Sequence, residues 1–162
     1  MRHTLAMLVV NHPGVMARVA GLYSRRGYNI NSIAVGETED PAVSRITMVV
    51  EAEDETELEQ ITKQLYKLID VIKISDITCD DAVERELALI KVYCNAGNRS
   101  ELLQIVDIFR AKIVDVSKEG VIIEVTGDTD KIEAMLSLLK PFGLKEIART
   151  GKVALVRSAV GR

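Results

Sequence analysis

The sequence predicts an α+β fold in which the order β-α-β-β-α-β occurs twice. Apolar residues make up 48% of the 162 residues, but there is no Trp, so the core must rest on Val, Ile, Leu and Ala. Val and Ile are β-branched and favour strands, and short apolar runs alternate with segments of helical periodicity. A charged stretch around Asp80, Asp81, Glu84 and Glu86 separates the repeats. We therefore expect two domains, over residues 1–79 and 80–162.

The first repeat has clear helix and strand signals. Val15, Val19 and Leu22 recur at helical spacing. Asp54 and Glu57 have the spacing of a capping box, which predicts the start of a second helix. In order, we expect a strand over 4–10, a helix from 15 to a C-cap at Gly27, a hairpin of strands over 29–35 and 44–51, a helix after Asp54 and a strand over 71–77. This order is ferredoxin-like, with helices on one face of an antiparallel sheet.

The second repeat has the same predicted order, with little residue-level identity to the first. Pro141 and Gly143 are expected to end its second helix. In order, we expect a strand over 87–94, a helix from Asn98 to Phe109, a hairpin of strands over 112–117 and 121–126, a helix opened by Asp130 and Glu133, and a last strand within 144–156, interrupted near Gly151. The whole chain is thus predicted as two tandem ferredoxin-like units.

Composition excludes several classes of protein. The net charge of −3 and the pI near 5.5 argue against broad nucleic-acid binding, which needs clustered positive charge. Cys79 and Cys94 form no CxxC pair, as expected in a reducing compartment. The apolar run Leu5–Val10 is too short for a membrane span or a signal peptide. We therefore expect a cytoplasmic protein.

Catalytic motifs are lacking in the sequence. The two histidines, His3 and His12, have no Ser, Cys or acid beside them in a nucleophile motif, and His3 is expected at the surface. No zinc spacing, P-loop or GxGxxG occurs. The strands over 29–35 and 44–50 carry no aromatic residue on which an RNA base could stack. A dedicated enzyme, a metal site and an RNA-recognition domain are therefore disfavoured.

The segment Asn11-His12-Pro13-Gly14 is the candidate ligand site. It lies between a strand and the amino terminus of a helix, where unpaired N–H groups and the helix dipole favour a carboxylate. Gly14 permits close approach, and Asn11 and Asn29 offer amide groups to an amino acid. Val15, Met16 and Ile30 could hold a small aliphatic side chain. The alternative is a plain turn, since Asn, Pro and Gly form turns that bind nothing.

Further segments along nearly the whole chain support a family resemblance. They are Asn11-x-x-Gly14-Val15 followed by Arg25-Arg26-Gly27-Tyr28-Asn29-Ile30, then Asp40-Pro41-x-x-Ser44-Arg45-Ile46-Thr47, Val83-Glu84-Arg85-Glu86-Leu87, Ile113-Val114-Asp115-Val116 and Glu146-Ile147-Ala148-Arg149-Thr150-Gly151. Together they resemble the regulatory small subunit of acetohydroxyacid synthase (acetolactate synthase), whose amino-terminal domain is an ACT domain.

The resemblance implies a non-catalytic subunit in branched-chain amino-acid (valine and isoleucine) biosynthesis. ACT domains of that family pair edge to edge into a homodimer, and L-valine or a related amino acid binds where they meet. The effector residues implied are Asn11, His12, Pro13, Gly14, Val15 and Met16 of one chain with Asn29 and Ile30 of the other. His12 and Pro13 would act by position rather than by chemistry.

The catalytic large subunit is the implied partner. Thiamine diphosphate, a divalent metal and FAD would belong to it, and this chain would bind no cofactor. Arg18, Arg25 and Arg26 are expected on a solvated helix face, with contact to the catalytic chain as the alternative. Two other functions stay open: a free-standing ACT-type regulator of another enzyme, and a fragment of a ligand-responsive transcription factor, although neither chain end has room for a helix-turn-helix.

Overall fold

The computed structural model describes residues 1–158, which divide by their contacts into two compact units. The first unit contains residues 1–83 and 152–158, and the second contains 84–151. No helix of the described part of the chain is long and apolar enough to cross a membrane. The elements of the first unit are β1 (Arg2–Val10), α1 (Val15–Arg26), β2 (Ile30–Glu37), β3 (Val43–Glu51), α2 (Glu55–Tyr66), β4 (Val71–Asp76) and, after the second unit, β9 (Val153–Val156).

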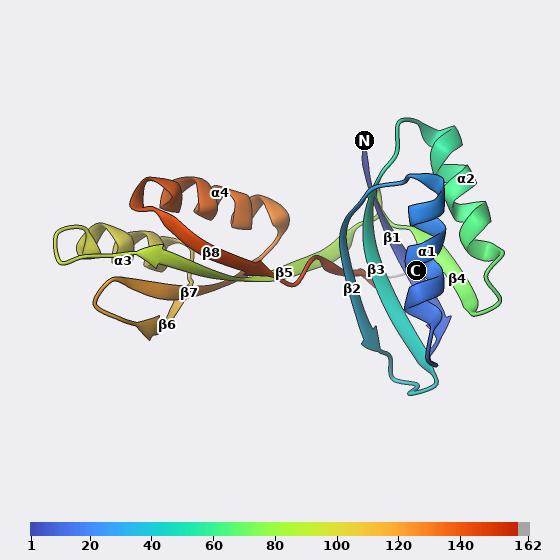
Figure 1. Ribbon diagram of the computed structural model, residues 1–162, viewed down its shortest axis with the longest axis horizontal. Helices are drawn as coiled ribbons and strands as arrows, with labels where there is room; N and C mark the ends of the chain where they lie inside the picture. Colours follow the sequence, from blue (N-terminus) through green and yellow to red (C-terminus); the bar gives the residue numbers. More distant parts are fainter. Residues whose placement is uncertain (159–162) are drawn as a thin grey trace. The chain divides into compact units, whose positions relative to one another are not determined.

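The first unit confirms the predicted ferredoxin-like arrangement. Its four strands pair in the order β2-β3-β1-β4, and β1 pairs antiparallel with both β3 and β4. Helices α1 and α2 cover one face of this sheet (Figure 1). Since β1 is central, β2 and β4 are left as the two edges of the four-stranded sheet.

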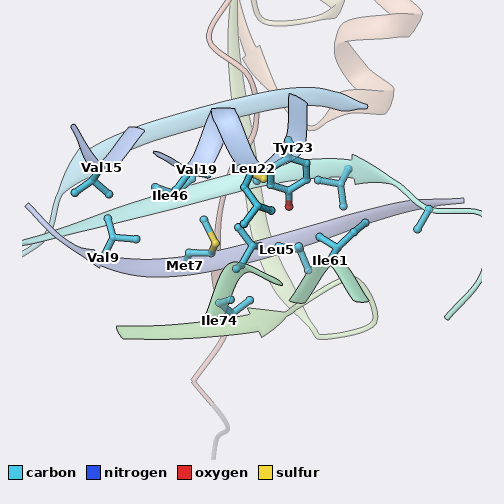
Figure 2. Close-up of a cluster of buried hydrophobic side chains, with 14 residues drawn as sticks. Leu5, Met7, Val9, Val15, Val19, Leu22, Tyr23, Ile46, Ile61 and Ile74 are labelled. Atoms are coloured by element: carbon cyan, nitrogen blue, oxygen red, sulfur yellow. The ribbon is translucent and has the colours of Figure 1, made fainter. Parts of the chain in front are cut away.

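Alternate residues of the strands meet the helices in a closely packed core (Figure 2). Leu5, Met7 and Val9 of β1 point to the same side, as the period of two in a strand requires. Against them pack the helical positions that periodicity predicted in α1, together with Ile46 of β3 and Ile61 of α2. Burying a large aliphatic side chain stabilises the fold by roughly 1.5–3 kcal/mol, so this face holds the unit together.

The helix ends follow the predicted cap chemistry, with one shift. Gly27 ends α1 in the left-handed conformation at φ 71°. Asp54 accepts from Glu57 N at 2.8 Å, which confirms the predicted cap of α2. The start of the fourth helix was predicted two residues too late: Asp128, not Asp130, accepts from Lys131 N at 2.8 Å.

The segment after Gly151 differs from the domain expectation. Residues 152–158 pack with the first unit, although they were expected in the domain over 80–162. Ala154 is buried with Ala6 and Ile77 on the sheet face that carries no helix. Lys152 Nζ also donates to Thr4 Oγ1 at 3.3 Å. The segment returns because alternate residues on this face of β1 are also apolar or small and need cover.

The second unit repeats the arrangement, and its sheet order is β6-β7-β5-β8. Strand β5 begins at Ala82, so Glu84 and Glu86 of the charged stretch lie in a strand, whereas Asp80 and Asp81 precede it. The core of this unit joins residues of β5 and β7 to residues of both its helices. Its elements are β5 (Ala82–Tyr93), α3 (Arg99–Ile108), β6 (Lys112–Val116), β7 (Gly120–Gly127), α4 (Thr129–Leu139), the 3-10 turn η1 (Lys140–Phe142) and β8 (Leu144–Arg149).

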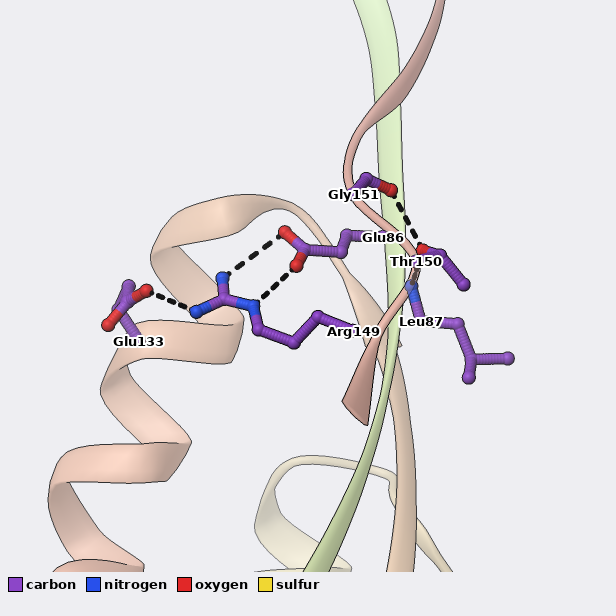
Figure 3. Close-up of polar contacts among 6 residues, drawn as sticks. All are labelled: Glu86, Leu87, Glu133, Arg149, Thr150 and Gly151. Carbon is purple, nitrogen blue, oxygen red and sulfur yellow. Dashed lines mark hydrogen bonds and ion pairs between the residues drawn. The ribbon is translucent and has the colours of Figure 1, made fainter. Parts of the chain in front are cut away.

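A charged cluster joins β5, β8 and α4 in the second unit (Figure 3). Arg149 donates from Nε to Glu86 Oε1 at 2.6 Å and from Nη1 to Glu133 Oε1 at 2.8 Å. Glu86 is buried, with 6% of its surface exposed. The hydrogen bond to Glu86 raises the pKa of Arg149, so the guanidinium stays charged. The cluster therefore satisfies a carboxylate that would otherwise be buried without a partner.

Candidate functional site

The start of α1 is an open helix terminus. Gly14 is its N-cap in the left-handed conformation at φ 87°, no side chain caps the helix, and its first turn holds no acidic residue. By contrast, the aspartates at the starts of α2 and α4 each accept a backbone N–H. An uncapped amino terminus presents unpaired N–H groups and the positive end of the helix dipole. This end of α1 can therefore receive a carboxylate.

Asn11 lies where the loop meets the end of β2. Its Nδ2 donates to Pro41 O at 2.9 Å and to Glu37 Oε1 at 3.3 Å. Its backbone N–H donates to Ala42 O at 2.8 Å. The amide is therefore held in an exposed position beside the last residue of an edge strand, and among residues 1–158 no donor occupies its Oδ1, which could accept from a ligand.

The buried carboxylate of Asp70 anchors the loop over residues 11–14. Asp70, 5% exposed, accepts from Arg18 Nε at 2.8 Å, and its Oδ1 lies 2.8 Å from His12 Nε2. Its backbone oxygen also accepts from Val10 N at 2.8 Å. Arg18 is 47% exposed, as expected for a solvated helix face, but its guanidinium also pairs with this buried carboxylate, a contact that the sequence did not predict. One side chain thus fixes both the loop and the first turn of α1.

The remaining predicted residues divide into two groups. Val15 is 5% exposed and its side chain belongs to the core, so this side chain is not free to hold a ligand as the sequence suggested, and only its backbone N–H could do so. Met16 is partly buried at the start of α1. Asn29 is exposed, and Ile30 is partly buried where β2 begins. Within one chain, the structure brings residues 11–16 together but not residues 29 and 30.

Strand register explains this separation. Ile30 pairs with Val50, which itself pairs with His3 near the start of β1. Asn11 follows the opposite end of β1, where Val10 pairs with Val43. The two ends are separated by most of a strand of nine residues, or about 25 Å at 3.3 Å per residue.

The connection before β2 is firmly anchored. The rings of Tyr23 and Tyr28 meet edge to face, with centroids 6.0 Å apart, and Tyr28 N donates to Tyr23 O at 3.1 Å. Burial raises the pKa of Tyr23, and Tyr28 raises it further, so the hydroxyl is neutral. Asn29 follows directly and is therefore presented in a defined position.

His3 is buried, although the sequence predicted it at the surface. His3 is 6% exposed, because β1 is the central strand and His3 lies level with the buried Val50. Its Nδ1 is 3.5 Å from Asp76 Oδ2. Among the described residues 1–158, no group of three or more His, Cys, Asp or Glu side chains could hold a metal ion.

Removing the Asp70 carboxylate should loosen the loop. We expect Asp70→Ala to reduce the free energy of unfolding by about 1–2 kcal/mol, since it removes charge-assisted hydrogen bonds. Amide hydrogen exchange at Asn11–Arg18 should become faster. Arg25→Gln, an exposed change near the end of the same helix, is the control. Unchanged exchange in Asp70→Ala would contradict a fixing role.

The comparisons with known proteins cover both units. Residues 5–73 match the AHAS small subunit-like ACT domain, and residues 85–158 match the small subunit of acetolactate synthase. The chain belongs to the acetolactate synthase small subunit family. The acetolactate synthase small subunit of Mycobacterium leprae is 55% identical over 159 residues, covering 98% of this chain and 94% of the relative.

Other members of the family agree over the same length. The acetolactate synthase small subunit of Bacillus subtilis is 52% identical over 157 residues, covering 97% of this chain and 91% of the relative. The crystal structure of the acetolactate synthase small subunit from Thermotoga maritima has a TM-score of 0.88 and 50% identity, covering 99% of each chain. The first unit is thus an ACT domain with the family's second domain after it.

Proposed function

We propose that this chain is the non-catalytic regulatory subunit of a cytoplasmic acetolactate synthase, which it stimulates and makes sensitive to feedback inhibition by L-valine. The observation that carries the proposal is the uncapped start of α1, held by Asp70 beside the end of edge strand β2. In a family of synthase small subunits, an uncapped helix start on an ACT domain favours binding of an effector that carries a carboxylate.

A second copy of the chain would complete this site. Strand β2 is an edge of the four-stranded sheet, so its outer backbone groups are available for pairing. If two copies pair antiparallel along β2, the start of one strand lies beside the end of the other. Asn29 and Ile30 of one copy would then lie near Glu37 and Asn11 of its partner, and the residues that one chain keeps apart would meet.

Each part of valine has a candidate partner in such a site. The carboxylate would accept from the N–H groups of Gly14, Val15 and Met16 at the start of α1. The ammonium group would donate to amide oxygens of Asn11 and of Asn29 from the other copy. The isopropyl group would pack on the partly buried Met16 and Ile30.

Regulation would act through the catalytic large subunit. Thiamine diphosphate, the divalent metal and FAD are expected to belong to that partner, as the family resemblance implies. Valine must bind two arrangements of the ACT pair with different affinity, or it shifts no equilibrium. Such couplings are typically worth about 1–3 kcal/mol.

The test is acetolactate formation by the catalytic subunit from the same organism, with and without this chain, and then with L-valine. We expect stimulation that valine reverses. Stimulation without valine sensitivity would keep the partner and reject the effector. No stimulation would reject the partner, and calorimetry against a panel of amino acids would then test for a free-standing ACT-type regulator.

A further inference from the structure

A groove of about 320 Å³ lies in the first unit, on the sheet face that carries no helix. We propose that it binds a small aliphatic carboxylate, at a site separate from the α1 effector site. The lining residues are Ala6, Leu8, Arg45, Lys73, Ser75, Ile77, Asp80, Leu155 and Val156. None of them is among the effector residues proposed above, and the two sites lie at different parts of the unit.

Strand register places Arg45 and Lys73 on opposite sides of the groove. Leu8 of β1 pairs with Arg45 of β3 on one side and with Lys73 of β4 on the other, so the three side chains form a row. Neighbouring strands are about 4.8 Å apart, which puts the two flanking Cα atoms roughly 10 Å from each other. Two long basic side chains can therefore converge on an anion above Leu8.

The donors of these cations are incompletely used. Arg45 donates from Nη2 to Ala154 O at 3.0 Å, but its Nε is buried and has no hydrogen-bond partner among residues 1–158. The ammonium group of Lys73 forms no ion pair or hydrogen bond with any of residues 1–158. A buried donor without a partner is energetically costly. A bound carboxylate would satisfy it.

The rest of the lining sets the size and charge of the ligand. Asp80 is the one acid among the described residues that line the groove, so two cations and one carboxylate leave a net charge that matches a monoanion. Leu155 and Val156 of β9 are 62% and 47% exposed, and together with Ile77 they form an apolar wall. Contact with an aliphatic chain would remove this apolar surface from water. A ligand of a few carbon atoms ending in a carboxylate fits both features.

Isovalerate is the probe, because it has the aliphatic chain and carboxylate of this class but lacks the ammonium group that the effector site requires. We expect titration of the 162-residue chain, followed by backbone NMR, to shift the amide signals of Ala6, Leu8 and Leu155 in a saturable way. Isovaleramide, which has the same shape without the charge, should leave these signals unshifted.

Two variants separate the proposal from a purely structural role of Arg45. Lys73→Gln should weaken isovalerate binding about tenfold, the loss expected for one charge-assisted contact. Arg45→Gln should weaken it at least as much. Lys63→Gln, on helix α2, is the control and should bind as the unaltered chain does. Equal affinity in Lys73→Gln, equal binding of the amide, or shifts confined to Asn11–Met16 would each overturn the proposal.

Discussion

Gly14→Asp should abolish the response to L-valine while stimulation of the catalytic subunit is kept. The new carboxylate would lie at the start of α1, where the carboxylate of valine is proposed to bind. Two like charges about 4 Å apart repel by about 4 kcal/mol at an effective dielectric constant of 20, which is more than a hundredfold in affinity. The measurement is the valine concentration that half-inhibits acetolactate formation.

The substitution meets no steric clash, and the backbone strain of a side chain at this positive φ is shared by its control variant. A Cβ atom at Gly14 would meet Arg18 Nη1 at 3.5 Å, an ordinary contact, although φ is +87°. Asp and Asn adopt left-handed conformations more readily than most residues. Gly14→Asn is therefore the matched control, with the same size and no charge. If it abolishes valine inhibition as completely as Gly14→Asp, charge repulsion is not the cause.

Arg149→Met should destabilise the second unit by about 3 kcal/mol, because it leaves the Glu86 carboxylate buried without a partner. The value is at the lower end for such pairs, since 32% of the Arg149 side chain is exposed and water can reach the gap. Native-state amide hydrogen exchange at Ile90 and Ile123 would measure it, because both residues are fully buried in this unit.

Two further variants separate the contacts of Arg149. Glu133→Gln removes a partner whose side chain is 58% exposed, so it should change stability by no more than about 1 kcal/mol. Replacing both members of the buried pair, with Glu86→Leu and Arg149→Met, should recover much of the loss. If Arg149→Met is as stable as the unaltered chain, then water solvates Glu86 once the guanidinium is removed, and the prediction is wrong.

Local pattern was enough to predict most of the fold. Val15, Val19 and Leu22 are all buried on one face of α1, as their spacing requires. Gly27 takes the left-handed conformation that its position after the helix predicted. Such signals act over a few residues, so they can be read without knowing how the chain folds back.

Contacts between distant residues could not be predicted in this way. Arg18 and Asp70 are 52 positions apart, and nothing beside either residue in the sequence marks it as paired. The burial of His3 depends on β1 being central, which is a property of strand order rather than of its neighbours. The ion pair of Glu86 could not be predicted either, because its partner Arg149 lies 63 positions away.

The return of residues 152–158 to the first unit makes that unit discontinuous in the chain. On the ribosome, β1 to β4 are complete long before the strand that covers their helix-free face has been synthesised. Until then, the side chains of Ala6 and Ile77 stay open to water or to other chains. A truncation after residue 79 would make that transient state permanent. An isolated ACT domain of this protein should therefore be joined from Val83 directly to Lys152, so that its last strand is kept.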